Sequence, residues 1–488
     1  MKPTVGGIYI REDVWGLPEW DPTLLWYARG VAGMQAKPIT DPTSWRYQAA
    51  IHDYVRAGDP LAVNGEALPS TADQNKFWRQ CQHGGWFFLP WHRGYLAHFE
   101  QTVRAEIVRQ GGPSDWALPY WNYSDDEEPR ARLVRKEFRD RTLPDGKPNA
   151  LANVVRGQNP GEITHGAATG DFGIDENDVA LDCLTQPLFQ AGIGAQSFGG
   201  PATGFHHNPG PSGALEATPH GAVHSEVGGW LGQFHTAGLD PLFWLHHANI
   251  DRLWEVWLKR NAAFANPSSA AWLTALVFPI HNATGAATTF TSKDVLDTRA
   301  PLLAYEYEDT SDPLETAGLA AVGGEPPMPG EEPPATVLAG ASAGPVALSA
   351  EVTTARIPVD PALRTTEGAA LADAGPGAGR VYLNVENIVG TDNTASYRVY
   401  INTPEGQPPS KEHYAGLLPM FGVAEASRDG DQHGGSGLTQ VLDITDLVNR
   451  LKGANTWRPD DLKVTFVPKR KERTGSGLKV GRISLYYS

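Results

Sequence analysis

The sequence predicts a mainly α-helical domain, a four-helix bundle with long loops, followed by a small all-β sandwich domain. Up to about residue 310, long loops alternate with helical patterns rich in Trp, Tyr and His. Residues 311–345 are rich in Pro, Gly and Glu, as in an exposed linker. From 346 to 488 the chain consists of short Val-, Ile- and Tyr-rich runs between Gly, Asp and Asn clusters, which is typical of strands and turns. We therefore expect domains at 1–310 and 346–488, joined by a linker at 311–345.

Composition excludes several classes of partner. The 488 residues include 40 Lys and Arg against 56 Asp and Glu, a net charge of −16. Nucleic acids and anionic membranes require dense positive charge, which this chain lacks. No window approaches the roughly 18 consecutive apolar residues of a membrane span. Two cysteines cannot form a disulfide framework, and the first residues lack the pattern of a secretion signal, so we expect a cytoplasmic protein.

Two helices in the first half of the helical domain are expected to carry inward-facing histidines. One begins near Thr40-Asp-Pro42 and carries His52. The second begins at Pro90 and ends at Gly111-Gly112, because proline favours the first turn of a helix and glycine follows its end. His92 lies four residues before a leucine of the buried stripe and therefore faces inward with it.

Two later helices show the same start signal, a capping residue followed by proline. Thr218-Pro219 begins one of them, and His220 and His224 then lie one turn apart on the same side. Asp240-Pro241 begins the other, in which His247 shares the apolar face. The four helices form a bundle with histidines at its centre.

A bound metal explains these histidines best. Each buried imidazole needs partners for both ring nitrogens, and no matching set of buried carboxylates is visible nearby. Sites made only of imidazoles suit copper, zinc, iron or nickel. A dinuclear hydrolytic zinc site normally includes bridging carboxylates, which the helices do not offer at ligand spacing. The residues therefore favour copper.

Three stretches resemble the copper-binding segments of the type-3 copper family of tyrosinases, catechol oxidases and molluscan haemocyanins. Residues 81–100, CQHGGWFFLPWHRGYLAHFE, resemble the CuA segment. Residues 240–254, DPLFWLHHANIDRLW, resemble the CuB segment, together with HGAVH at 220–224. The sequence from Tyr305 to Tyr307 matches the Tyr-x-Tyr that closes the family's catalytic domain, and the carboxyl-terminal part more weakly resembles the domain that follows it in plant-type polyphenol oxidases.

The resemblance implies a polyphenol oxidase with two copper ions. Such an enzyme uses O2 to oxidise o-diphenols to o-quinones, with monophenol o-hydroxylase (tyrosinase) activity, and its substrates are small phenols. An o-aminophenol oxidase and a haemocyanin-like oxygen carrier use the same dicopper site and remain alternatives. The oligomeric state stays open.

The resemblance also implies the copper ligands. They are His52, His83 and His92 for CuA, and His220, His224 and His247 for CuB. In the pair His246-His247 the family ligand precedes an aspartate by four residues, which selects His247. We expect His246 to line the pocket and orient the aromatic substrate, and Asp251 to accept a hydrogen bond that orients a ligand imidazole.

Four further positions gain a role from the resemblance. Cys81 matches the cysteine that forms a thioether with the imidazole two residues later, here His83. Glu216 matches a glutamate that holds a water near the copper and can act as a base. Phe234 matches a phenylalanine over CuA, and Gly221 stands where efficient monophenol hydroxylases often carry asparagine.

The remaining histidines have no ligand spacing, and we expect most of them on the surface or in loops. They are His98, His165, His206, His207, His235, His281, His413 and His433. In the sandwich domain, the apolar loop at 414–422 is a candidate plug for the active site through Leu417, Leu418, Met420 and Phe421. The alternative is that these four side chains pack inside their own domain.

Overall fold

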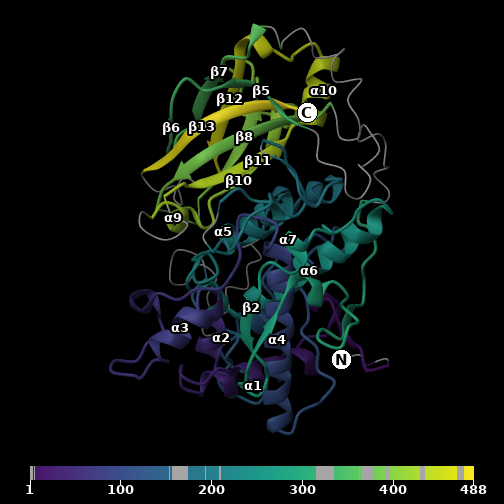
Figure 1. The fold of residues 1–488 in the computed structure, drawn as a ribbon, viewed down its shortest axis with the longest axis vertical. Helices are drawn as coiled ribbons and strands as arrows, with labels where there is room; N and C mark the ends of the chain where they lie inside the picture. The colour runs from purple at the N-terminus through teal and green to yellow at the C-terminus, as the bar shows by residue number, and fades with distance from the viewer. Residues whose placement is uncertain are drawn as a thin grey trace.

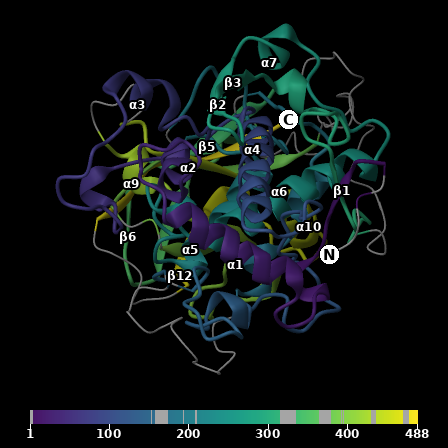
Figure 2. The same ribbon diagram turned by 90° about the horizontal axis from the view of Figure 1, so that it is seen from below.

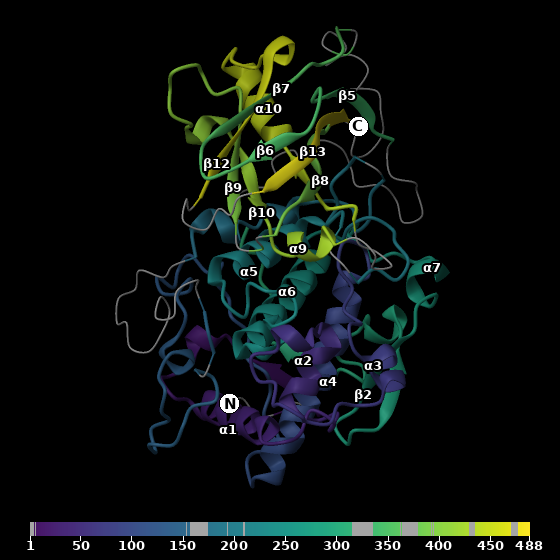
Figure 3. The same ribbon diagram turned by 90° about the vertical axis from the view of Figure 1, so that its left-hand side faces the viewer.

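The computed structural model consists of a helical part and a β-sandwich part that lies against it (Figure 1). It describes residues 4, 6–152, 154–156, 174–192, 194–207, 210–314, 335–361, 363, 379–391, 393, 395–428, 435–469 and 477–488. The short helix α5 (Ala222–Val227) lies beneath the sandwich, above the longer helices (Figure 3). This architecture confirms the predicted order of a mainly helical domain and a β domain.

The helical part is built around two long helices, α4 and α6. Its helices are α1 (Pro22–Gln35), α2 (Trp45–His52), α3 (Thr71–Phe77), α4 (Phe88–Arg109), α5, α6 (Pro241–Arg260) and α7 (Ala270–Leu273). Helix α4 packs against both α6 and α1, and α1 lies beside α4 at the end away from the sandwich (Figure 2). Strands β2 (Phe278–His281) and β3 (Ala287–Phe290) pair in an antiparallel ladder, and β1 (Tyr9–Arg11) pairs in parallel with β4 (Tyr305–Tyr307). None of the described helices is long and apolar enough to cross a membrane.

Capping residues decide where these helices begin. The Asp240 carboxylate accepts a hydrogen bond from the N–H of Leu242, and α6 begins at the predicted proline. Helix α1 has the same signal, since Asp21 accepts from the N–H of Thr23 and a proline follows. Our sequence analysis missed α1, although this signal would have found it.

Three helix starts differ from their prediction. Helix α5 begins at Ala222, after the predicted Thr218-Pro219; a separate short helical segment, Glu216–Gly221, precedes it and is interrupted by the extended backbone of Thr218. Helix α2 begins at Trp45, after the predicted Thr40-Asp-Pro42, because the Ser44 hydroxyl accepts from the N–H of Tyr47 and caps the helix there. Helix α4 begins at Phe88, before the predicted Pro90. A proline in the first turn costs no hydrogen bond, since an N–H there has no partner within the helix.

The sandwich consists of two antiparallel sheets. Its strands are β5 (Val337–Ala341), β6 (Val346–Leu348), β7 (Thr353–Ile357), β8 (Val381–Val389), β9 (Ser396–Ile401), β10 (Tyr414–Pro419), β11 (Leu438–Asp443), β12 (Leu462–Pro468) and β13 (Leu478–Tyr487), with short helices α9 (Val423–Ala426) and α10 (Thr445–Gly453). One sheet has the order β10-β9-β12-β7, and the other has the order β11-β8-β13-β5 with β6 also on β13. Strand β5 falls within the range expected to be a linker, so the sheet includes residues before 346.

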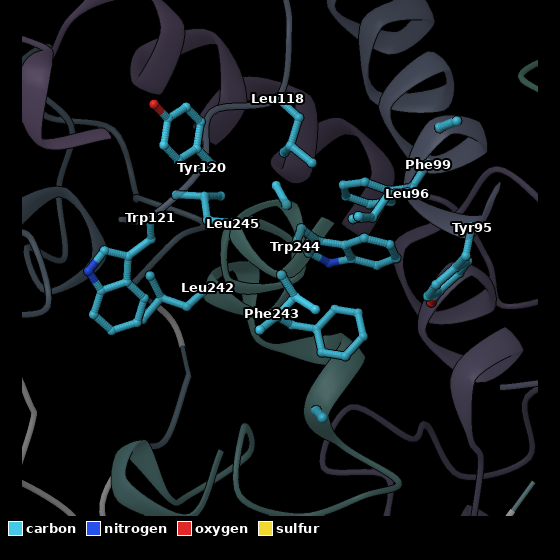
Figure 4. Close-up of a cluster of buried hydrophobic side chains, with 14 of the residues drawn as sticks. Tyr95, Leu96, Phe99, Leu118, Tyr120, Trp121, Leu242, Phe243, Trp244 and Leu245 are labelled. Carbon is cyan, nitrogen blue, oxygen red and sulfur yellow. The ribbon is translucent and has the colours of Figure 1, made fainter. Parts of the chain in front are cut away.

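Each part has its own hydrophobic core. In the helical core Trp244 of α6 stacks on Phe99 of α4, with Tyr95 and Phe243 beside them (Figure 4). The sandwich core lies between its two sheets. One residue crosses this division: Phe421, which follows β10, packs into the helical core.

Candidate metal centre

Two groups of buried histidines meet in the middle of the helical part. Within each group, one ring nitrogen per residue lies within 4.8 Å of the others; the groups are His52, His83 and His92, and His220, His224, His246 and His247. The rings of His92 and His247 stack with their centroids 4.5 Å apart and so join the two groups. The structure therefore brings together all six histidines that the sequence analysis assigned to copper, in the expected two sets.

Backbone carbonyls fix the tautomer of three of these rings. The Nδ1–H groups donate from His92 to Phe88 at 2.8 Å, from His220 to Glu216 at 3.1 Å and from His224 to Leu231 at 2.7 Å. Because Nδ1 carries the proton, Nε2 of each ring keeps a free lone pair. A metal ligand requires this arrangement.

The other ring nitrogens of the six have no protein group that satisfies them. Both nitrogens of His52 and His83 lack a partner, as do Nε2 of His92, Nε2 of His220 and Nδ1 of His247. The Nε2 atom of His224 contacts only Nε2 of His247, at 3.4 Å. Burial lowers the pKa of all six, to about 3 in His92 and His224. Neutral imidazoles with unsatisfied lone pairs are the donor set that two copper ions need.

A cavity of about 20 Å³ lies beside the second group, with room for about one water. Glu216, His220 and Gly221 line it. The Glu216 Oε1 atom accepts a hydrogen bond of 2.8 Å from the N–H of Gly84, whereas Oε2 has no partner. Burial raises the pKa of Glu216 to about 8. Its free carboxyl oxygen can hold a water, and the raised pKa makes the ionised carboxylate a stronger base toward that water.

Two phenylalanine rings lie next to the histidines. Phe234 has its ring centroid 5.1 Å from that of His52 and 4.7 Å from that of His83, so it covers the first group as expected for this position. Phe421 belongs to the sandwich part, yet its ring stacks on His224 with centroids 4.0 Å apart and an interplanar angle of 9°. An aromatic ring from the carboxyl-terminal part thus occupies the space beside the second group.

The predicted plug loop divides between the two parts. Leu418 and Met420 are fully buried inside the sandwich core, and Leu417 lines a separate cavity between the two parts. Only Phe421 of the four candidate residues lies beside the histidines. The expectation of a four-residue plug was therefore wrong for three of them. The pleat of β10 directs Leu417 and Leu418 to opposite faces, whereas Met420 and Phe421 follow the end of the strand.

His246 does not line the cavity, contrary to the sequence prediction. Its ring is fully buried and lies parallel to that of His220, with centroids 5.4 Å apart and an angle of 17°. The hydroxyl of Tyr123 is 3.1 Å from its Nδ1. Its Nε2 has no hydrogen-bond partner, and it belongs to the second histidine group. In this closed arrangement the ring supports the imidazole of His220, and its role toward a substrate stays a prediction.

Asp251 also has a different role from the one expected. Its carboxylate accepts hydrogen bonds from Arg93, Tyr305 and Tyr307, at 2.5, 2.5 and 2.6 Å, and none from a ligand histidine. Arg11 of β1 lies 3.4 Å away. Burial alone would raise the pKa of Asp251, but the two guanidinium groups hold it below its ordinary value. Asp251 therefore ties α6 to α4, β1 and β4.

Cys81 is buried beside a histidine that the sequence analysis left without a role. Its Sγ lies 3.1 Å from Nδ1 of His207, and Nε2 of His207 lies 3.4 Å from a carboxylate oxygen of Asp53. His207 lies in a loop, as expected for most of these histidines, but it is only 6% exposed. The thioether between Cys81 and His83 stays a prediction.

Other histidines are buried as well. His98, His281 and His413 are each less than 9% exposed. The Nδ1–H of His98 donates to the carbonyl of Gly94, and the Nδ1–H of His413 donates to the carbonyl of Ile401. None of the three belongs to a histidine group found among the described residues. His206 and His235 are partly exposed, and His165 and His433 lie outside the described residues.

Comparison with known proteins places this site in a family. The common central domain of tyrosinase matches residues 42–260, and a domain of unknown function (DUF7868) matches residues 335–488. Tyrosinase HcTyr1 of Hahella sp. (strain CCB-MM4) is 34% identical over 490 residues, which cover 98% of this chain and 98% of that protein. The chain belongs to the tyrosinase family. It is a copper-dependent oxidoreductase with two copper ions, to which the two histidine groups correspond.

More distant members of the tyrosinase family share parts of the chain or its fold. A chloroplastic polyphenol oxidase of Malus domestica is 27% identical over 303 residues, 59% of this chain and 46% of that protein, so the chain matches less than half of that relative's length. The structure of latent apple tyrosinase superposes with a TM-score of 0.60 at 20% sequence identity, and the match covers 100% of this chain and 98% of the apple protein's chain. Latent aurone synthase from its natural source gives a TM-score of 0.61 at 21% identity and covers 100% and 91%. These structures show that the whole fold is shared.

Proposed function

We propose that the protein is a polyphenol oxidase that oxidises o-diphenols to o-quinones with O2 and hydroxylates monophenols more slowly. The observation that carries this proposal is the position of Phe421. Its benzene ring lies flat on His224, so the space beside the second histidine group accepts an aromatic ring of the size of a phenol. Small phenols are the substrates that we propose.

We propose His52, His83 and His92 as the ligands of CuA, and His220, His224 and His247 as those of CuB. The copper pair supplies the redox chemistry by which O2 takes electrons from a bound phenol. The chain supplies the remaining functions. Phe234 limits how far a ring can move toward the first group, and His246 braces His220 by stacking on it.

Glu216 is our candidate for the base that monophenol hydroxylation needs. A monophenol must lose its hydroxyl proton, and the free Oε2 of Glu216 can receive it through the water that the cavity accommodates. Gly221, beside Glu216, has no side chain with which to hold that water. We therefore expect o-diphenol oxidation to exceed monophenol hydroxylation, and Gly221→Asn to raise the hydroxylase share. A Cβ at this position would lie 3.3 Å from the Glu216 carbonyl oxygen and 3.6 Å from Pro419, so the variant must be assayed with the sandwich part removed.

We also propose that residues 346–488 act as a lid. Phe421 is 7% exposed and occupies the place of the substrate ring, so a phenol can bind only after this side chain leaves. Cutting the chain within residues 311–334, before strand β5, would allow the sandwich part to dissociate.

An absorbance assay with catechol, tyrosine and o-aminophenol, before and after such a cut and at equal copper content, tests the proposal. We expect quinone formation to rise several-fold on cutting, with catechol turned over faster than its monophenol. Oxygen binding without quinone formation would identify an oxygen carrier, and preference for o-aminophenol would identify an o-aminophenol oxidase. Unchanged turnover after cutting, with copper and fold intact, would contradict the lid.

A further inference from the structure

A buried lysine of the sandwich part lies between two buried carboxylates of the helical part. Lys469 follows β12, and its side chain is 6% exposed. Its ammonium contacts the carboxylates of Asp178, in the short helix Glu176–Val179, and of Glu226, in α5; the distance to Glu226 is 3.0 Å. The two acidic side chains are 1% and 2% exposed. We call these three residues the buried triad.

Lys469 of the triad and Phe421 leave the same end of one sheet. Strand β9 pairs with β10 on one side and with β12 on the other. At its beginning, the carbonyl of Ala395 accepts from the N–H of Met420, and the carbonyl of Ser396 accepts from the N–H of Lys469. Phe421 and Lys469 are thus held two strand spacings apart, about 10 Å. A rigid sheet therefore links the position of the lysine to that of the aromatic ring.

The sandwich contacts three consecutive residues at α5. Phe421 stacks on His224, the hydroxyl of Ser225 donates to the carbonyl of Asn393 at 3.0 Å, and Lys469 pairs with Glu226. Helix α5 is only six residues long and carries one of the proposed copper ligands. The lid is thus fastened to the helix that it covers.

Long-range attraction between the parts contributes little to this fastening. Residues 346–488 carry sixteen Lys and Arg and sixteen Asp and Glu, so the net charge of −16 belongs to residues 1–345. A part without net charge gains little from the field of the other. Local contacts must therefore hold it in place.

We propose that Lys469 is the latch that keeps Phe421 over the site, an inference that rests on the lid of the proposed function. Removing the lysine leaves two buried carboxylates without a positive charge, which strongly penalises the closed state. In the open state water solvates the same carboxylates. The pair of Arg398 and Asp175, which also joins the two parts at 2.6 Å, is 29% and 32% exposed and contributes little, because water screens it.

The experiment compares Lys469→Met with Arg398→Met in the full chain. The measured quantity is the catechol turnover of the uncut protein divided by that of the cut protein. We expect Lys469→Met to raise this ratio to at least one half, and Arg398→Met to leave it near the wild-type value. As a readout independent of activity, the two fragments of the cut protein are titrated against each other by size-exclusion chromatography. Lys469→Met should raise their dissociation constant at least tenfold.

The charge balance of the triad suggests a second variant, for which we expect the opposite effect on closing of the lid. Asp178→Asn leaves one lysine with one carboxylate, so it should keep the protein closed or lower the dissociation constant of the fragments. A variant Lys469→Met that stays as latent as wild type, or an Asp178→Asn that opens the protein as Lys469→Met does, would overturn the latch. If cutting does not activate the wild type, the lid fails, and the fragment titration still tests the latch separately.

Discussion

Three backbone carbonyls decide which nitrogen of the central histidines is free to bind copper. The carbonyls of Phe88, Glu216 and Leu231 each hold an Nδ1–H. Each ligand is oriented by main chain, which cannot be lost by substitution of a side chain. The backbone of the segment Glu216–Gly221, of α4 and of the loop after α5 therefore preorganises the site.

Replacing His224 tests the second copper position. Its Nε2 belongs to the group that includes His220 and His247, and a three-imidazole site that loses a ligand loses most of its affinity. We expect His224→Ala to lower the copper content from about two ions per chain to about one, measured by elemental analysis after copper loading. His281→Gln is the matched control, because His281 is buried but lies outside both groups. Two coppers in His224→Ala would refute the assignment.

The thioether is tested by mass and by counting thiols. Formation of the bond takes one hydrogen from the Cys81 thiol and one from a ring carbon of His83, and O2, the co-substrate of the copper site, takes up the two electrons. After copper is removed, protein that was loaded with copper in O2 should therefore be about two mass units lighter than protein that was never loaded. Cys81 and Cys183 are both buried, which makes Cys183 an internal control. After unfolding, we expect one alkylated cysteine in the copper-loaded protein and two in the copper-free protein. Two alkylated cysteines in both would reject the bond and leave Sγ of Cys81 against His207.

The residues that sequence analysis placed correctly are those whose position follows from short-range spacing. His220 and His224 are four residues apart on one helical stretch, and His247 follows a capped helix start. The role of Asp251 could not be predicted in this way, because its partners come from α4, β1 and β4, up to 240 residues away. Helical spacing says which face a side chain is on but not which distant groups meet it.

At the scale of elements, the start of α6 combines two functions in one side chain. Asp240 caps the helix and also pairs with Arg156 at 2.6 and 2.8 Å, and both residues are almost fully buried. Asp21 caps α1 in the same way but is partly exposed. The two helices therefore start with the same signal, but we expect the two aspartates to contribute very different amounts to the free energy of unfolding.

Replacing each aspartate by alanine separates these functions. Asp21→Ala removes a cap and should lower the free energy of unfolding by about 1 kcal/mol. Asp240→Ala also leaves the buried Arg156 charge without a carboxylate, with only the carbonyls of Phe138 and Leu151 as partners, and should cost about 3–5 kcal/mol. Thermal unfolding at equal copper content measures the difference. Equal losses of stability would mean that the pair with Arg156 adds nothing beyond the cap.

Element boundaries were less predictable than the elements themselves. Helix α2 starts where Ser44 caps it, and two nearby signals, Pro42 and Ser44, could not be ranked from sequence alone. Strand β5 was assigned to a linker because Ala- and Gly-rich residues surround it, yet β13 provides the edge with which it pairs. Whether such a segment forms a strand depends on the partner strands that the rest of the fold provides.

At the scale of the whole molecule, we propose that closing of the lid is coupled to proton binding. Burial, and then the neighbouring Glu226, raise the pKa of Asp178 to about 7 against an ordinary value of 3.8, although Lys469 opposes the rise. The other charged groups that face it are Lys469 and Asp175. Since the closed state binds this proton more tightly than the open state, its extra stability is present at low pH and is lost as pH rises through about 7.

We therefore expect the full-length protein to be more latent at about pH 5.5 than at about pH 8. The measured quantity is the ratio of catechol turnover before and after cutting at each pH, which cancels the pH dependence of the reaction itself. Asp178→Asn should remove most of the pH dependence of this ratio. A wild-type ratio that rises toward acid pH would contradict the linkage.

The pairing of β1 with β4 sets a limit on how the chain can be shortened. Arg11 and Tyr305 to Tyr307 enclose the carboxylate of Asp251, so the first and last strands of the helical part complete its interior together. A protease that cuts after residue 314 leaves this enclosure whole. One that cuts before residue 305 removes two hydroxyl donors from a buried charge and should yield an unstable fragment. If proteolysis releases the proposed lid, the position of a single cleavage therefore decides whether the product is an active enzyme or an unstable fragment.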